Sequence, residues 1–357
     1  MHSRDNELSP PQLFHQWASY RASDILMPQP GRLQLVHRLQ MPHSSCFCGH
    51  SATIAIIDHT YRGREEFRRA ADKIGDANGK PLDLNKYVVP CAFNNIVSFF
   101  YGDLFTHDHP MRSKLHSLMN QAAAVLFVGQ LSQQPLALTA DDYLVGNINS
   151  FLMAGTFSTS MTLMWQMINF AKNPDTVQAR VQREIDEVVG HERRPTWEDR
   201  KRMPYTMASV WEVERWKTPS ALGVARECAE DVVVGDIFIP KGTIVLPNMW
   251  AVHNDHSLWK EPAKFYPERY LSEDGKSLLH KPQHYIPFSI GQRACAGETF
   301  AKMEIFLLIT FLLQKYRVVA ENPIEWDLNA PETELSNISH IKLRFLPRKL
   351  GKVQRND

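Results

Sequence analysis

Apolar and polar positions alternate with helical spacing over much of the chain, beginning at about residue 62. This spacing predicts helices over 84–102 and 109–129, the first of which Pro90 interrupts. The first fifty residues carry five prolines and show little periodicity, so the pattern predicts no regular element there. The regular part of the chain is therefore expected to begin near residue 62.

The longest predicted helix begins at the capping box Thr139-x-x-Asp142 and ends at Lys172. Its apolar residues cover most of its circumference, which is typical of a helix that runs through the centre of a domain. The next segment has a single apolar stripe and is therefore predicted to be a surface helix. It runs over 175–190, and the stripe is formed by Val177, Val181, Ile185 and Val188.

The later part of the chain changes from helix to strand and back. A second capping box at 196–199 predicts a short helix, and another helix is expected over 204–217. Segment 231–247 is rich in β-branched residues and broken by glycine turns, so it predicts one or two hairpins. A last apolar helix after Gly297 and short C-terminal strands complete the pattern. The predicted fold class is mainly α with a small β region (α+β), with a small sheet formed by the later half.

Composition excludes several classes of protein. The 357 residues are 43% hydrophobic and carry 40 basic against 39 acidic side chains, so nothing indicates a nucleic-acid partner. The N-terminal segment lacks the apolar core of a secretory signal, and the longest apolar run, 305–313, is about half of what a bilayer needs. Taken alone, the sequence predicts a soluble, intracellular protein of one large or two ordinary domains.

Five cysteines form an odd and sparse set, which argues against a disulfide framework. Cys46 and Cys48 form C-x-C, which could be half of a metal site, but no second pair supplies the remaining ligands. His107 and His109 raise the same question, and a solvated turn before Pro110 is the simpler interpretation. Spacing alone therefore predicts no metal centre at either group.

The loop PFSIGQRACAGETF surrounds one cysteine with other residues at fixed spacing. Its pattern F-x-x-G-x-R-x-C-x-G is formed by Phe288, Gly291, Arg293, Cys295 and Gly297. A thiol ligates a metal well when its thiolate is stabilised, and the free N–H groups at the start of a following helix favour the anion. The glycines let the backbone fold closely around the sulfur, and the phenylalanine can shield it from water.

This set of residues suits a cysteine that ligates one face of a haem, with the arginine available to a propionate. The alternative is a buried structural cysteine in a turn before a helix. Five such residues at this spacing arise by chance in roughly one chain of this length in ten thousand, which favours the ligand interpretation.

Two further motifs accompany the cysteine loop. Glu212-Val-Glu-Arg215 matches E-x-x-R, and FYPERY contains a P-E-R segment with Arg269. With these motifs in order, the sequence over 139–348 resembles the cytochrome P450 family, and above all its animal microsomal branch, which handles drugs and other lipophilic compounds. The resemblance implies the cytochrome P450 fold, in which Glu212, Arg215 and Arg269 form a structural network and do no chemistry.

The resemblance also implies an oxygen-binding stretch on the long helix, where the family has A/G-G-x-D/E-T-T/S. Here Ala154 and Gly155 match, Ser158 stands for the alcohol, and Phe157 replaces the acid. These three matching positions are the candidate catalytic residues, and Ser158 can still donate and accept hydrogen bonds. Since Phe157 carries no proton, delivery is expected through water or the neighbouring threonines, with slower or more uncoupled turnover.

The implied cofactor is haem b, with Cys295 as the axial iron ligand and with Arg293 and Arg226 near the propionates. The implied activity is a monooxygenase that inserts one oxygen atom from O₂ into a lipophilic small molecule. Electrons would come from NADPH through NADPH–cytochrome P450 reductase, with cytochrome b5 as a second partner, at the endoplasmic reticulum membrane. Lys281, Arg293 and Lys302 are candidate contacts for an acidic partner, although solvated surface charge explains them equally well.

The sequence also departs from that family. Residues 1–60 match it poorly, 61–357 are predicted to form the haem domain, and the membrane anchor and part of the distal roof helices are expected to be missing. Trp17-x-x-x-Arg21 fits the family's W-x-x-x-R string, but its surroundings do not. Two other functions stay open: a haem-thiolate isomerase or dehydratase that acts on peroxides without a reductase, and a truncated, non-catalytic haem-binding protein.

Overall fold

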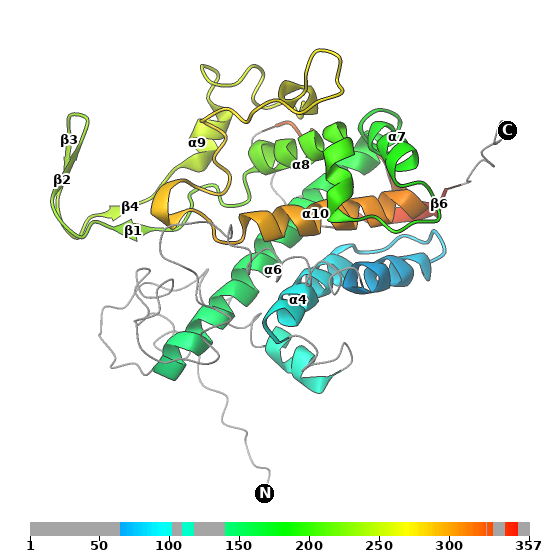
Figure 1. The fold of residues 1–357 in the computed structure, drawn as a ribbon, viewed down its shortest axis with the longest axis horizontal. Helices are drawn as coiled ribbons and strands as arrows, with labels where there is room; N and C mark the ends of the chain where they lie inside the picture. The colour runs from blue at the N-terminus through cyan, green and yellow to red at the C-terminus, as the bar shows by residue number, and fades with distance from the viewer. Residues whose placement is uncertain (1–64, 102–108, 118–139, 326, 331–339, 349–357) are drawn as a thin grey trace, which may run out of the picture. The chain divides into compact units, whose positions relative to one another are not determined.

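The computed structural model describes residues 65–101, 109–117, 140–325, 327–330 and 340–348 (Figure 1). Several sequence predictions lie outside these residues, namely those at Trp17, Arg21, Cys46, Cys48, His107 and Thr139 and the whole segment 1–60. Within the described part of the chain, no helix combines the length and the apolar character that a bilayer crossing needs. The same residues contain no cluster of three or more histidine, cysteine, aspartate or glutamate side chains that could hold a metal ion.

The chain divides into two compact units. The first comprises Met1–Cys48 and Phe93–Thr156, and the second comprises Gly49–Ala92 and Phe157–Asp357. Two of the boundaries, at 92–93 and 156–157, fall inside helices, namely α4 (Asn85–Tyr101) and α6 (Ala140–Lys172). The candidate cysteine loop and the E-x-x-R motif both belong to the second unit.

Both of these helices confirm the periodicity of the sequence. Helix α4 continues through Pro90, which removes one backbone hydrogen bond but does not end the helix. Helix α6 has 33 residues, and every residue from Leu163 to Phe170 is at most 3% exposed. The second half of α6 is therefore surrounded by protein on all sides, as its apolar circumference predicts.

The described part of the first unit consists of the end of α4, a helix over 110–117 and the first half of α6. Arg112 is buried, and its Nη2 donates to Ser98 Oγ at 3.0 Å, which ties the short helix to α4. The rings of Phe100 and Phe151 lie 5.5 Å apart and join α4 to α6. The predicted helix over 109–129 is thus confirmed as far as residue 117.

The second unit carries most of the secondary structure. Its helices after α6 are the π-helical turn Pro174–Gln178, α7 (Ala179–Val188), the 3-10 helix Trp197–Arg202, α8 (Pro204–Lys217), α9 (Met249–Asn254), the 3-10 turns Pro267–Tyr270 and Gly291–Arg293, and α10 (Glu298–Lys315). A further helix over 65–75 precedes α4. The capping box at 196–199 is present with both of its hydrogen bonds, but the helix that it opens is 3-10.

Helices α7, α8 and α10 pack together and form the core of the second unit (Figure 1). The predicted stripe on α7 faces inward, since Val181 and Ile185 are fully buried. Helix α10 is buried from Lys302 to Gln314, and the rings of Trp165 and Trp216 meet edge to face at 5.7 Å where α6 meets α8. Each large apolar side chain in this core contributes about 1.5–3 kcal/mol by leaving water.

The strands form three separate antiparallel pairs instead of the single small sheet expected. They are β1 (Arg226–Glu227) with β4 (Ile244–Val245), β2 (Val232–Val234) with β3 (Ile237–Ile239), and β5 (Tyr316–Ala320) with β6 (Leu343–Pro347). The turn at Gly235 produces the predicted hairpin, and the left-handed backbone there (φ 60°) explains the glycine. A second hairpin does not form, because β4 pairs with β1 and not with β3.

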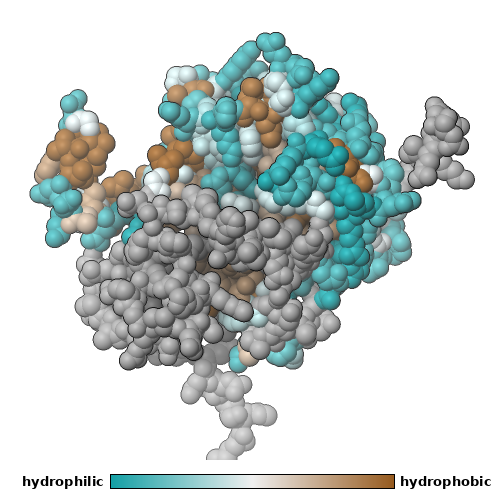
Figure 2. Space-filling view, in the orientation of Figure 1, coloured by the Kyte–Doolittle hydropathy of each residue, from teal (hydrophilic) through white to brown (hydrophobic). Residues whose placement is uncertain are grey.

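The β2–β3 hairpin projects from the helices of the second unit and exposes apolar side chains (Figures 1 and 2). Val233 is 64% exposed, Ile237 67% and Phe238 59%. Successive residues of a strand point to opposite faces, so Ile237 and Phe238 show that both faces of this ribbon meet solvent. The mainly α architecture with small β elements confirms the predicted fold class.

Candidate functional site

The cysteine loop is held in shape by its own backbone. The Cys295 N–H donates to the Phe288 carbonyl at 2.8 Å, and Gly291–Arg293 forms a 3-10 turn between them. Gly291 has φ 77°, a left-handed conformation that favours glycine. Ser289 has φ 61° without being glycine, which costs about 1–3 kcal/mol and is typical of backbone at functional sites.

The sulfur of Cys295 lies at the start of α10. Gly297 is the N-cap of that helix, and a Cβ at this glycine would lie 3.8 Å from the Cys295 sulfur, so the backbone passes close to it. Although Cys295 is exposed as a residue, desolvation raises the pKa of its thiol, and the Gly297 N–H lowers it. The Gly297 N–H therefore stabilises the thiolate as predicted, but burial has the larger effect. A thiol of this kind loses its proton when it binds a metal ion.

Two arginines meet beside this loop. Arg226 on β1 donates through Nη2 to the carbonyl of Arg293 at 3.0 Å, and both side chains are half-buried. The contact joins residues 67 positions apart in the chain and anchors the loop to a strand. The Arg226 side chain thus contacts the backbone of Arg293, the other arginine for which the sequence predicts a role at the propionates.

Glu212, Arg215 and Arg269 form one buried network. Arg215 donates to both oxygens of Glu212 at 2.9 and 2.8 Å, and Arg269 Nε lies 3.1 Å from each of them. The side chains of Glu212 and Arg215 are 0% exposed and that of Arg269 is 9% exposed. The Tyr266 N–H also donates to Glu212 at 2.9 Å, so the carboxylate is fully satisfied. No solvent reaches the carboxylate, which suits the predicted structural role.

His253, which the sequence patterns do not single out, links this network to the cysteine loop. Its Nε2 accepts a hydrogen bond of 3.0 Å from the Ile286 N–H, just before the loop, and its carbonyl accepts one of 2.9 Å from Arg215. Its Nδ1 lies 2.8 Å from Thr218 Oγ1, which itself donates to the Arg215 carbonyl. Nδ1 is therefore the protonated nitrogen of a neutral ring, because Nε2 and Thr218 Oγ1 act as acceptors.

We expect His253 to make folding stability depend on pH. Burial, with help from Arg215 and His284, lowers the pKa of His253 to about 4. In the unfolded chain its pKa is about 6.5, so between these values the unfolded state binds the additional proton and stability falls as the pH falls. The loss is about 3 kcal/mol from pH 7 to pH 4.

Urea unfolding of the parent and of His253→Gln at pH 7, 6, 5 and 4 measures this effect. The difference in unfolding free energy between the two proteins should shrink toward pH 4, because glutamine does not titrate. A constant difference across that range would contradict the assignment.

The candidate oxygen-binding stretch lies on α6. Ala154 and Ser158 are four residues apart, so they share one helix face, and both are exposed. Gly155 has no room for a larger side chain, because its Cβ would lie 2.5 Å from Ile96 Cδ1. Because residues 154 and 155 are small, their side chains project little from the helix at this point.

The threonines beside this pair point elsewhere. Thr156 is 0% exposed and donates to the Leu152 carbonyl at 2.6 Å, and Thr159 is 2% exposed. Neither hydroxyl shares the exposed face of Ser158, and a proton route through Thr156 or Thr159 stays a prediction. Ser158 is the hydroxyl of this stretch that lies on the exposed face of α6.

The lysines considered as partner contacts differ from one another. Lys302 is 7% exposed and pairs with Glu298, so it cannot serve as a surface contact. Lys281 keeps 28% of its side chain exposed and lies 3.7 Å from the same carboxylate. Lys302 lies on α10 and Lys281 in the loop before the cysteine, and the charge pattern alone does not distinguish their burial.

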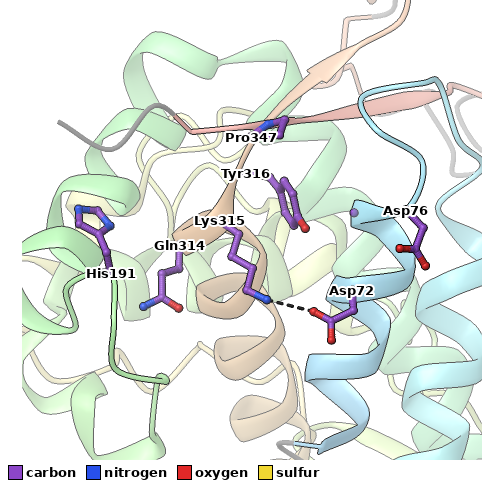
Figure 3. A pocket seen from close by; sticks show the side chains of 8 residues that line it. Asp72, Asp76, His191, Gln314, Lys315, Tyr316 and Pro347 are labelled. Carbon is purple, nitrogen blue, oxygen red and sulfur yellow. Dashed lines mark hydrogen bonds and ion pairs between the residues drawn. The ribbon is translucent and has the colours of Figure 1, made fainter. Parts of the chain in front are cut away.

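A cleft of about 520 Å³ opens elsewhere in the second unit (Figure 3). It is lined by Asp72, Gly75, Asp76, His191, Gln314, Lys315, Tyr316 and Pro347. Lys315 and Asp72 pair across it at 3.1 Å. Since Lys315 ends the 18-residue helix α10 and Cys295 precedes its start, the cleft lies roughly 27 Å from the cysteine loop. It is not part of the candidate site.

Comparison with known proteins agrees with the motifs. The family profile described as Cytochrome P450 matches residues 131–338, more than half of the chain. The chain is 40% identical over 179 residues to Cytochrome P450 2U1 of Bos taurus, a match that covers 50% of this chain and 32% of that relative. It is 43% identical over 176 residues to Cytochrome P450 2D9 of Mus musculus, covering 49% and 34% respectively. The matched part thus spans about a third of the length of these curated relatives, and this chain belongs to the cytochrome P450 family.

Proposed function

We propose that this chain holds the haem-thiolate centre of a monooxygenase that inserts one atom of O₂ into a lipophilic small molecule. The observation that carries the proposal is the cysteine loop, in which Cys295 is presented at the start of α10 and pinned through its own N–H to Phe288. A single thiol framed by close backbone, two arginines and an aromatic ring fits the ligand set of a haem iron.

The residues of this chain have distinct roles in that centre. Cys295 Sγ would bind the haem iron, Phe288 and Gly297 would enclose the sulfur, and Arg293 and Arg226 would pair with the propionates. Bound haem supplies the redox chemistry that activates oxygen, and the protein binds, orients and excludes water. The buried network of Glu212 would support the loop without touching substrate.

Proton delivery would depend on Ser158. Its hydroxyl lies on the exposed face of α6 and can pass on a proton taken from water. Phe157 offers no acid beside it, so Ser158 and water would have to supply the protons that oxygen activation consumes. We therefore expect a substantial share of the electrons to end in hydrogen peroxide.

Phe157→Asp should raise coupling, because it places a titratable carboxylate next to Ser158. The measurement is peroxide released per NADPH consumed, in the haem-loaded protein with reductase. General acid catalysis is worth roughly 10²-fold or more where it operates, so the expected drop in peroxide yield is large. Phe157→Asn is the matched control, since asparagine is polar and similar in size to aspartate but has no titratable carboxyl group. Tight coupling in the parent, unchanged by Phe157→Asp, would refute the idea.

The test of the proposed function is the spectrum of the reduced protein with carbon monoxide. Full-length protein expressed with a haem supply should show the Soret band that is characteristic of thiolate ligation. A histidine-type band or an absent band would favour the non-catalytic alternative.

The electron donor and the location are proposed with the activity. An NADPH–cytochrome P450 reductase would supply the electrons, with cytochrome b5 as a second donor, at the endoplasmic reticulum membrane. Purified reductase and NADPH should reduce the haem-loaded chain under carbon monoxide, and failure to do so would count against this partner.

A second function is favoured by one observation. Phe157 occupies the acid position, and Thr156 and Thr159 are buried. The exposed face of α6 therefore presents the Ser158 hydroxyl without an acid at position 157, which is poorly suited to delivering protons for O₂ activation. A haem-thiolate isomerase or dehydratase acting on a peroxide needs neither that acid nor a reductase. Consumption of a lipid hydroperoxide without NADPH would identify this alternative.

A further inference from the structure

A cluster of buried charges lies beside the cysteine loop, within the second unit. Glu214 on α8 is 1% exposed, and the Tyr285 hydroxyl donates a hydrogen bond of 2.5 Å to its Oε2. Its other oxygen, Oε1, has no hydrogen-bond partner among the described residues. Such a carboxylate is costly to bury unless opposite charge faces it.

Two lysines lie beside the tyrosine that binds Glu214, with Lys281 Nζ 4.9 Å and Lys302 Nζ 5.9 Å from the centre of the Tyr285 ring. Lys302 pairs with Glu298, and its Nζ lies 4.7 Å from the centre of the Phe288 ring. Lys281 Nζ lies 3.7 Å from Glu298 Oε1. Burial raises the pKa of Glu214 above its ordinary value, and Lys302, the hydrogen bond from the tyrosine and Lys281 offset only part of that rise. The cluster therefore has the partners that an ionised Glu214 requires.

The cluster affects Cys295, the proposed iron ligand, in two ways: by a contact with the cysteine loop and by its charges. Lys302 stacks on Phe288, whose carbonyl accepts the Cys295 N–H, so the ammonium contacts the cysteine loop itself. Besides burial and the Gly297 N–H, the charges of Glu298 and Glu214 raise the pKa of the Cys295 thiol and that of Lys302 lowers it, so all three charges act on its sulfur. A fixed charge that acts on a metal ligand favours one oxidation state of the metal, because buried charges are poorly screened.

We propose that Glu214 is a positioning residue that keeps a negative charge beside the cysteine loop and thereby lowers the reduction potential of iron bound to Cys295. The inference rests on the proposed function, because it concerns the haem-loaded chain. The physical reason is that a nearby anion stabilises the ferric state, which carries one more positive charge than the ferrous state. Tyr285 and Lys302 hold the carboxylate in its ionised form and place it.

The first experiment reads the charge of Glu214 without haem. Burial and Lys302 lower the pKa of Lys281 to about 8, and Glu214 opposes that shift. In the full chain, Glu214→Gln should therefore increase the rate at which acetic anhydride modifies Lys281 at pH 7, measured by peptide mass spectrometry. Glu187→Gln, at an exposed carboxylate on α7, is the matched control and should leave the rate unchanged.

The second experiment measures the midpoint potential of the haem-loaded protein by spectroelectrochemistry. Glu214→Gln should raise the potential while the thiolate-type carbon monoxide band persists, and Glu187→Gln should not. Tyr285→Phe removes the hydrogen bond to Glu214, which lowers the pKa of that carboxyl group. In this variant the change of midpoint potential with pH, which follows the ionisation of Glu214, should therefore occur at higher pH.

These outcomes separate the two proposals. An unchanged Lys281 rate in Glu214→Gln would show that Glu214 carries no charge and would overturn the inference whether or not haem binds. A raised rate with an unmoved potential would overturn it as well, because the charge would not reach the iron. A chain that shows the rate change but binds no haem would overturn the proposed function, and with it the effect on iron, while the charge of Glu214 would stand.

Discussion

Cys295→Ser is expected to abolish the thiolate-type carbon monoxide band completely. Serine has nearly the same size, and the loop is held by backbone contacts such as Cys295 N–H to the Phe288 carbonyl, so the fold of the loop should survive. The hydroxyl, however, is far harder to deprotonate than a thiol and is a poor ligand for haem iron. The measurement is the reduced carbon monoxide spectrum, with bound haem quantified in the same sample.

Cys228→Ser provides the matched control. Cys228 is also a free cysteine, half-buried where Cys295 is exposed, and it lies in the same unit but outside the cysteine loop. Its replacement should leave both the band and the haem content unchanged. If Cys295→Ser retained the parent's spectrum, the iron ligand would have to be another side chain and the proposed function would fail.

Arg215→Ala should lower the free energy of unfolding by about 3–5 kcal/mol, because it leaves a fully buried carboxylate short of its partner. Arg215 makes two hydrogen bonds to Glu212, and its Nη1 also donates to the His253 carbonyl. Arg269 remains beside Glu212 but cannot replace both of the hydrogen bonds that Arg215 makes to this carboxylate. Urea unfolding at pH 7, followed by circular dichroism, measures the loss.

Lys201→Ala is the control for that prediction. Lys201 pairs with Glu198 at 2.5 Å, but the two side chains are 66% and 67% exposed. Surface pairs of this kind contribute up to about 1 kcal/mol, so the variant should unfold almost as the parent does. Equal losses in the two variants would show that burial of Arg215 does not govern its contribution.

Much of the fold could be predicted because it depends on near neighbours in the chain. The apolar circumference of α6 and the single stripe of α7 are helical periodicities, and each follows from side chains three or four positions apart. The cysteine loop is equally local, since its turn, its glycines and the start of α10 span about ten residues. These elements therefore appear where the sequence places them.

Strand pairing was predicted less well. The hairpin at Gly235 follows from a local turn, but β4 pairs with β1 across 16 intervening residues. Two-residue strands carry too little periodicity to choose a partner, so the choice depends on how the surrounding loops pack. The sequence pattern could not distinguish these pairings.

The sequence by itself determined the family, the cysteine loop and the pairing of Glu212 with Arg215, since all of these depend on spacing along the chain. Only the tertiary structure decided which charges are buried and which side chains meet across long separations. It placed His253 between Arg215 and the cysteine loop, buried Lys302, and set Glu214 against Tyr285, 71 positions away. The physical reason is that a charge's environment depends on every element packed around it, whereas helical spacing and turn chemistry depend on adjacent residues alone.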